Sequence, residues 1–503
     1  MRATIATMLK ISHCRHWLAA IACLTAIGNA VAEPLAAPGD MRLRNDLQLL
    51  NDSGVFDISL SAWPVSLGDV HRATDAAVID GESDAVARAL ERVRRQLEWE
   101  LAPGEFDFVF GASAASEPRI IRTFEDTPRG ELEGFAKLSW VGERFAFNLE
   151  GRFVNDPIDG DEFRPDGTYV GAALGNWIVT AGWQERWFGP GRDGSLILGS
   201  NARPSPGIML QRNNTTPFET KWLSWLGPWS FTTFMTQLDD DREIKDALLF
   251  GIRGSFRPVK GLEIGITRTA QWCGEDRPCD LSTFGDLLLG NDNRGVNVDP
   301  EDEPGNQLAG LDIRWSLPAD IPVAAYMQWI GEDGRPGSGL IGSWMRQVGV
   351  EFWGRFGDFD HRTHFEVSDT LAREGGFGFS DEKPNVAYNH PIYKTGYRYN
   401  QRVIGHPADG DSLSYSLGST LVQSAGHTWN VSLRYMEINR AGSPNERHTL
   451  SPTPQEIADV QISHSRETRF GRFDLGLGYA SIDDELTGVS DKQTSVFLRW
   501  SSR

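Results

Sequence analysis

The sequence predicts a transmembrane β-barrel of about 18 antiparallel strands. Three observations favour this fold over a soluble one. The chain opens with a secretory signal, it then repeats segments of about ten residues in which apolar and polar side chains alternate, and the joints between these segments are alternately short and long. We therefore expect a signal peptide at 1–32, a periplasmic helical segment at 33–104 and an outer-membrane β-barrel at 105–503.

The amino end has the three parts of a secretory signal. Basic residues without any acid occupy 1–17, Leu18–Ile27 is a short apolar stretch, and Ala30-Val31-Ala32 is a small-residue cleavage site. The apolar stretch is too short to span a membrane, because a membrane helix needs about 20 residues. We expect cleavage after Ala32; a lipoprotein anchored through Cys23 is the alternative.

Two-residue alternation dominates the rest of the chain, as in Arg144–Phe153. It gives strands with one apolar and one polar face, at the length of a tilted strand that crosses a bilayer. Because every backbone polar group in lipid needs a partner, such strands must close into a barrel. We expect strands near 105–112, 133–141, 143–153, 166–174, 176–184, 205–225, 228–238, 246–257, 261–271, 306–317, 321–331, 343–354, 360–369, 412–421, 428–437, 456–465, 470–481 and 491–500.

The joints between the strands predict the orientation. Tight joints such as Val141-Gly142-Glu143 and Leu226-Gly227-Pro228 alternate with long ones. Bacterial barrels have short periplasmic turns and long outer loops, so both barrel ends should face the periplasm. Trp residues near many segment ends suit the aromatic girdles at the two membrane surfaces. The long joints are 113–132, 154–165, 185–204, 271–305 and 370–411.

The segment before the barrel has a different pattern. Met41–Asp52 and Asp84–Leu101 have helical spacing, and Val55–Leu60 is interpreted as a short strand. By the orientation above, this segment lies in the periplasm, at or in the lower barrel mouth. It is either a plug or folding aid, or a docking surface for export machinery.

The charge of the chain argues against one class of binding partner, and its cysteines predict a disulfide. The chain has 49 basic and 69 acidic residues, which argues against nucleic acid as a partner. Outside the leader, Cys273 and Cys279 are the two cysteines. After export so close a pair is expected to form a disulfide, and a zinc site is the alternative.

Several blocks of sequence after the leader are long enough to be specific. They are Leu43–Leu47, Gly54–Phe56, Ser59–Pro64, Trp183–Gly191, Gly194–Ile197, Arg203-Pro204, Met209–Arg212, Glu303–Gly310 and Gln328–Asp333. These blocks resemble the capsule assembly protein Wzi family, and the resemblance covers nearly the whole chain after the leader. It departs at Cys273 and Cys279 and in the long loop 370–411.

The resemblance implies an 18-strand outer-membrane barrel with a small periplasmic helical part. It also implies a lectin-like role: the protein would hold capsular or exopolysaccharide at the cell surface, downstream of a separate export channel. Within the matching blocks, Asn306, Gln307 and Trp329 are candidate glycan-binding residues.

The long outer loop 185–204 supplies further candidates for binding a glycan. Sugar rings need flat aromatic faces, and sugar carboxylates or hydroxyls need planar donors, which Arg provides. Trp187, Arg192 and Arg203 lie among Gly and Pro in this loop and supply both chemistries. A structural role stays open, in which Trp187 packs the loop and the arginines pair with Glu185 and Asp193.

The sequence predicts no enzyme and no cofactor. The acidic loop 291–304 could hold calcium, although its spacing is not that of an EF-hand and a solvated loop is the simpler interpretation. His361 and His364 should point to opposite faces of one strand, and adjacent Glu332 and Asp333 should point apart. The sequence therefore offers no metal site or catalytic pair among them.

Three functions remain in view. The first is a monomeric, non-enzymatic barrel that binds capsular or exopolysaccharide and lies among outer-membrane lipid and lipopolysaccharide. The second is a porin-like channel for anionic or sugar solutes, and the third is an outer-membrane enzyme that acts on lipid or glycan. Long outer loops rich in Gly, Pro and Trp favour a plugged barrel over an open channel.

Overall fold

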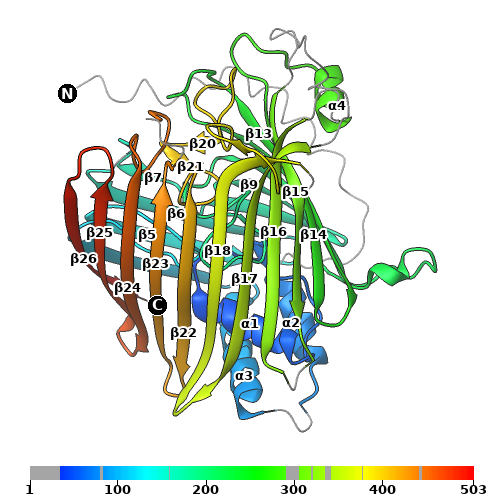
Figure 1. The fold of residues 1–503 in the computed structure, drawn as a ribbon. Coiled ribbons are helices and arrows are strands. Elements are labelled where there is room, and N and C mark those ends of the chain that lie inside the picture. Colours follow the sequence, from blue (N-terminus) through cyan, green and yellow to red (C-terminus); the bar gives the residue numbers. More distant parts are fainter. Residues whose placement is uncertain are drawn as a thin grey trace, which may run out of the picture.

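Eighteen long antiparallel strands close into one barrel in the computed structural model (Figure 1). The structure describes residues 34–79, 83–157, 159–289, 305–318, 321–334, 341–375, 378–440 and 445–502. The predicted signal peptide and the acidic loop 291–304 lie outside these residues. The strands are β4 (Phe106–Ala115), β5 (Leu132–Val141), β6 (Phe145–Asn155), β8 (Tyr169–Leu174), β9 (Trp177–Gly182), β11 (Gly207–Arg212), β12 (Trp229–Gln237), β13 (Leu248–Val259), β14 (Leu262–Trp272), β15 (Gly305–Ser316), β16 (Val323–Gly334), β17 (Ile341–Phe356), β18 (Phe359–Glu374), β22 (Leu413–Gln423), β23 (His427–Ile438), β24 (Gln455–Thr468), β25 (Gly471–Asp484) and β26 (Ser490–Ser501).

The barrel closes between its last and first strands. β26 pairs with β4 in antiparallel register, with Trp500 opposite Ala112, so no long strand is left with an open edge. This closure satisfies the backbone groups that lipid cannot. The predicted fold class is confirmed, and each expected strand overlaps an observed one. Short strands β7 (Phe163–Arg164) and β19 (Glu382–Lys383) add to the upper rim.

Polar side chains face the lumen and apolar ones face outward. In β24, Asp459, Gln461 and Ser463 are buried, whereas the intervening Val460 and Ile462 are exposed. A soluble barrel would show the reverse pattern. The exposed apolar band is what a bilayer requires, so the alternation seen in the sequence belongs to strands that cross a membrane.

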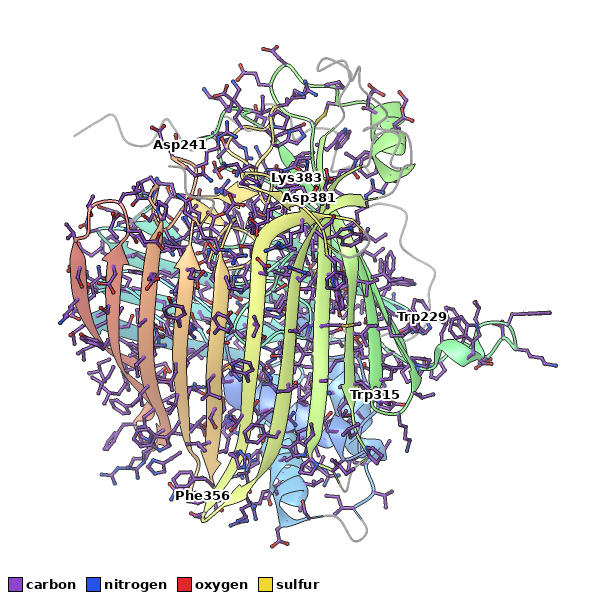
Figure 2. The ribbon with its side chains drawn as sticks, in the orientation of Figure 1. Trp229, Asp241, Trp315, Phe356, Asp381 and Lys383 are labelled. Carbon is purple, nitrogen blue, oxygen red and sulfur yellow. A yellow bond between two sulfur atoms is a disulfide. The ribbon has the colours of Figure 1, made fainter. Side chains whose placement is uncertain are left out.

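The two ends of the barrel differ as predicted. Most lower joints are short, and the longer connections lie at the upper end (Figure 1). Figure 2 shows the aromatic side chains of Trp315 and Phe356 near the lower rim, and Asp241, Asp381 and Lys383 among the upper loops. Aromatic residues at this level match the girdle of an outer-membrane barrel.

The amino-terminal segment lies in the lower mouth of the barrel (Figure 1). It contains α1 (Met41–Asp52), α2 (Leu67–Ala76) and α3 (Asp84–Glu100). Asp40 and Ser83 cap α1 and α3 by accepting hydrogen bonds from the third backbone N–H that follows each of them. Apolar faces of the helices meet in one core that includes Leu47, Leu90 and Val93.

Helix α2 was not predicted from the sequence. Among the described residues, no helix combines the length and apolar character needed to cross a membrane.

The expected strand at Val55–Leu60 is wrong. Most of these residues are buried, and their backbone groups bond to side chains or, for the N–H of Phe56, to the carbonyl of Leu50, rather than to a neighbouring strand. The side-chain amide of Asn51 makes two hydrogen bonds to the backbone of Ile58: it donates to the carbonyl at 2.7 Å and accepts from the N–H at 3.1 Å. Just beyond this segment, Glu263 accepts a hydrogen bond from the N–H of Ser61 at 3.1 Å. The strands that do form are β1 (Leu35–Ala36), β2 (Ala62–Trp63) and β3 (Val65–Ser66).

The long expected strand at 205–225 is also corrected. β11 ends at Arg212, and 213–228 forms a loop that includes a 3-10 turn, η3 (Ser224–Leu226). Consecutive Asn213 and Asn214 favour a turn, and Pro217 lacks the N–H that a strand ladder needs. The expected tight joint at Leu226-Gly227-Pro228 is therefore only the end of this longer lower loop.

The loop 213–228 carries exposed tryptophans at the lower edge of the barrel. Figure 2 shows a segment that projects sideways from the wall beside Trp229. Trp222 is 87% exposed and Trp225 is 60% exposed. The loop is fixed at its base, where Phe218 stacks on Trp229 with ring centroids 4.3 Å apart.

We predict that this loop lies in the lipid interface of the periplasmic leaflet, because Trp prefers that layer. In liposomes, phospholipids brominated near the headgroup should quench the tryptophan fluorescence of the native protein. Trp222→Phe combined with Trp225→Phe should remove part of that quenching, whereas Trp63→Phe, inside the lower mouth, should leave it unchanged. Equal quenching in all three proteins would contradict the prediction.

Candidate functional site

The loop 183–206 folds into the lumen and meets the amino-terminal segment there. Its short strand β10 (Trp187–Phe188) pairs with β2. The guanidinium of Arg44, on α1, donates to the carbonyl of Gly191 at 2.6 Å. An outer loop and a periplasmic helix therefore touch inside the barrel, and together they fill its centre.

Trp187 packs at this junction. Its side chain is 1% exposed, its indole N–H donates to the carbonyl of Gly189 at 3.2 Å, and its ring meets Phe124 edge-on at 5.4 Å. Arg44 lies over both rings. No face of the indole is available to a sugar while the loop keeps this conformation.

Arg192 belongs to a buried ionic network that joins the loop to the plug and the wall. It bonds to Glu351 at 3.1 Å and to the amide oxygen of Asn45 at 2.6 Å. Arg314 and Arg362 each bridge Glu351 and Asp52, at 2.6–2.9 Å. We refer to Asp52, Arg192, Arg314, Glu351 and Arg362 as the central network. The positive charge of Arg192 is thus paired with a carboxylate inside the protein.

Arg203 is also paired, on the outer side of the lumen. It bonds to Asp159, Asp161 and Asp166 at 2.9–3.0 Å. The two acids of the same loop have other partners: Glu185 pairs with Arg129, and Asp193 pairs with Arg434. The structural role considered from the sequence therefore predicted correctly that Arg192 and Arg203 form ion pairs, but it named the wrong partners.

The remaining candidate residues lie on the wall. Asn306 faces the lumen and donates to the side-chain oxygen of Gln271 at 3.0 Å. Trp329 lies on the outward face of β16, because its neighbour Gln328 points inward and donates to the carbonyl of Phe188. Gln307 faces outward too, beside Arg268. The structure does not bring Gln307 and Trp329 together with the loop residues.

A second outer loop, 375–412, closes the lumen from above. Tyr388 lies in the apolar core of the mouth, and its hydroxyl donates to the carbonyl of Leu196 at 2.7 Å. Its N–H donates to Glu332 at 2.8 Å, which gives Glu332 a structural role. The two loops therefore pack against each other above the plug, inside the barrel.

The predicted disulfide is present between Cys273 and Cys279. The hydroxyl of Tyr393 donates to the carbonyl of Cys273 at 2.9 Å, so the second loop rests against the disulfide loop. Within the described ranges, no group of three or more His, Cys, Asp or Glu side chains could hold a metal ion. His361 and His364 lie on opposite faces of β18, as expected from their spacing.

A small cavity remains on the outer side of this packing. It is lined by the loop 183–206, by Phe234 and Leu249 near the upper ends of β12 and β13, and by Tyr399 and Ile404 of the second loop. Arg186 faces this cavity. The sequence analysis did not single out Arg186, because nothing in the sequence distinguishes it from the arginines around it.

A family comparison agrees with this architecture. A family model described as capsule assembly protein Wzi matches residues 111–488. The chain belongs to the Wzi family. The predicted resemblance and the outer-membrane location are confirmed, since this family and the 18-strand barrel go together with that membrane.

Two relatives extend the comparison of this Wzi family chain. The solved structure of Wzi from Escherichia coli superimposes with a TM-score of 0.80, at 26% identity, over 93% of this chain and 98% of that one. That protein is described as an outer membrane protein involved in group 1 capsule assembly and as a carbohydrate-binding β-barrel. An uncharacterized 55.8 kDa protein in the cps region of Klebsiella pneumoniae is 34% identical over 332 residues, which is 65% of this chain and 63% of the relative.

The second loop of this Wzi family member contains two neighbouring carboxyls with opposite properties. Burial, together with the nearby charge of Asp409, raises the pKa of Asp411 to about 6. Burial also acts on Asp409, but Arg398 and His448 outweigh it and hold the pKa of Asp409 at about 2. The negative charge of Asp411 therefore destabilises the folded loop, whereas the negative charge of Asp409 stabilises it.

The pH dependence of stability should follow these directions. A raised carboxyl pKa means that the folded state holds the proton more tightly, so stability is lost as pH rises from about 4 to about 6. Asp411→Asn should remove this loss. At pH 7.5 it should increase the free energy of unfolding by up to about 3 kcal/mol, the equivalent of a pKa raised to about 6, and so raise Tm. At pH 4 it should leave Tm unchanged. The matched variant Asp409→Asn should lower Tm at pH 7.5. Parallel shifts in both variants would contradict the assignment.

Proposed function

We propose that the protein binds capsular or exopolysaccharide at its outer mouth and holds it at the cell surface during capsule assembly, without changing it chemically. The observation that carries this proposal is the filled lumen. Plug helices and two folded outer loops occupy it, so its upper face offers a binding surface rather than a pathway. The carbohydrate-binding description of the Escherichia coli relative and the cps location of the Klebsiella pneumoniae relative support it.

A porin-like channel is the weaker alternative. A conducting barrel needs a continuous aqueous lumen. Here the central network, the packing around Trp187 and the second loop all take up space inside the barrel. An enzymatic function gains no support from Glu332, the described member of the acid pair considered from the sequence, because its carboxylate accepts the backbone N–H of Tyr388 in the second loop.

The partners of this proposal follow from the barrel. Outer-membrane phospholipid and lipopolysaccharide surround the exposed apolar band, and the protein works as a monomer. The lower surface of the plug is available to export machinery, and the exposed face of α3 is its accessible part. No resident cofactor is required, and calcium at the acidic loop 291–304 would act only as a bridge to an anionic glycan.

Two measurements test the proposal. A strain that lacks the protein should release polysaccharide into the medium while total synthesis stays unchanged, and complementation should restore the cell-bound fraction. In planar bilayers, the purified protein should show no stable open state. Normal retention of polysaccharide in the deletion strain would refute attachment, and a large steady conductance would favour the channel.

A further inference from the structure

The cavity beside Arg186 holds an uncompensated positive charge. Arg186 is 6% exposed. Among the buried arginines of the described chain, it is the one whose guanidinium donates no hydrogen bond, and its Nε and Nη2 are buried without a partner. The other lumen arginines bond to carboxylates or to backbone carbonyls.

The local environment keeps Arg186 charged. Burial lowers its pKa to about 10, which still leaves the guanidinium protonated at neutral pH. The contact beneath it is the ring of Phe234, with the guanidinium carbon 4.6 Å from the ring centroid. An aromatic face attracts a cation but does not satisfy its N–H groups, so the planar donor edge of Arg186 stays unused.

The acids nearest in sequence and space do not neutralise Arg186. Glu185, which also lines the cavity, pairs with Arg129 at 3.1 Å. The three aspartates close to the cavity pair with Arg203. Each of these acids is therefore bonded to another arginine, and none of them bonds to the guanidinium of Arg186.

The cavity is small but has the chemistry to receive an acid group. Its volume is about 30 Å³, enough for about two water molecules or for a carboxylate group, while the sugar ring that carries the carboxylate would lie outside it. The hydroxyl of Ser200 in its wall is buried and has no hydrogen-bond partner, and Tyr399 adds an aromatic side chain. The lining comes from the outer loops and the upper strand ends, which is the side where a surface polysaccharide lies.

We propose that this cavity is an anion subsite in which Arg186 binds the carboxylate of an acidic sugar unit of the polysaccharide. The guanidinium fork matches a carboxylate in two parallel hydrogen bonds, and Phe234 holds the fork flat from the other side. The inference rests on the proposed function and adds the substrate class: a polysaccharide that contains uronic acid or another carboxylated sugar. Because the whole chain has a net charge of −20, such a local cation is what would allow a polyanion to be held.

Binding of two forms of one polysaccharide tests the proposal. The probes are the polysaccharide isolated from the surface of the producing cells and the same material with its carboxyls reduced to alcohols. The purified full-length protein in detergent should bind the native form about tenfold more tightly or better, as expected for charge-assisted hydrogen bonds. Arg186→Met should abolish this preference while leaving the affinity for the reduced form unchanged.

A matched control is Arg212→Met. Arg212 also stacks on an aromatic ring, that of Trp229 at 3.7 Å, and donates to backbone carbonyls, but it lies at the lower end of the barrel. It should keep the wild-type preference. The Tm of ligand-free Arg186→Met should equal or exceed that of the native protein, because no internal bond is lost.

The outcomes separate the two proposals. Equal binding of both forms by the native protein, or an unchanged preference in Arg186→Met, would overturn the anion subsite and leave the proposed function intact. A lower Tm of ligand-free Arg186→Met would show that the guanidinium serves the fold and would also overturn it. Binding of neither form would refute the proposed function itself.

Discussion

Asp52→Asn is expected to lower the free energy of unfolding by about 3–5 kcal/mol, the cost of removing one partner from a buried ion pair. Asp52 ends helix α1 and bonds to Arg314 at 2.7 Å and to Arg362 at 2.8 Å. All three side chains are almost fully buried. Without the charge of Asp52, Glu351 alone would face the three arginines of the central network, and water would not be available to compensate.

Unfolding in urea, followed by tryptophan fluorescence in detergent micelles, measures this loss. Glu243→Gln is the control, because Glu243 pairs with Lys394 at 2.7 Å between two outer loops and both side chains are about half exposed. An exposed pair of this kind contributes about 0–1 kcal/mol. The same Asp52 variant should show brief openings in planar bilayers, since α1 is held in the barrel mouth by this contact. If both variants unfold alike, the central network does not retain the plug.

The sequence carried enough information for the barrel and its orientation. Alternation and joint length are local features, and each strand needs only about ten residues to show them. One error lies where side chains replace a strand ladder, at Val55–Leu60, whose backbone bonds to the side chains of Asn51 and Glu263. The failure at 205–225 has a similar cause, because apolar residues of a loop that points outward look like a continued strand.

The roles of the candidate residues could not be predicted from local sequence features. The residue types were informative, since Trp187, Arg192 and Arg203 do lie in the loop that fills the mouth. Their partners were not, because Arg192 meets Glu351, 159 positions away, rather than an adjacent acid. Pairing across a barrel depends on strand register and on how loops fold inward, and neither is encoded near the residue.

Arg186 illustrates the opposite problem. In the sequence it stands between Glu185 and Trp187 and appears to have a ready partner. Folding turns Glu185 toward Arg129 and places Arg186 over Phe234. The absence of a partner for a charged group is a property of the folded structure, so the anion subsite had no signal in the sequence.

Trp187→Ala is expected to cost about 3–5 kcal/mol of folding free energy, the usual range for removing a large buried aromatic side chain. Trp187 is packed edge-on against Phe124, which in turn meets Trp63 edge-on at 5.1 Å. The three rings join the loop 183–206 and the loop between β4 and β5 to the amino-terminal segment. Trp222→Ala is the control, because at 87% exposure its loss should change stability by no more than about 0.5 kcal/mol.

The Trp187 variant also separates packing from sugar contact. If Trp187 only packs, Trp187→Phe should restore most of the stability, and its binding of native polysaccharide should equal that of the wild type, because the Arg186 cavity is kept. If Trp187 stacks directly on a sugar, Trp187→Phe should melt like the wild type but bind more weakly. The burial of the indole at 1% exposure favours the first result. Urea unfolding and polysaccharide binding, measured on the same preparations, distinguish the two.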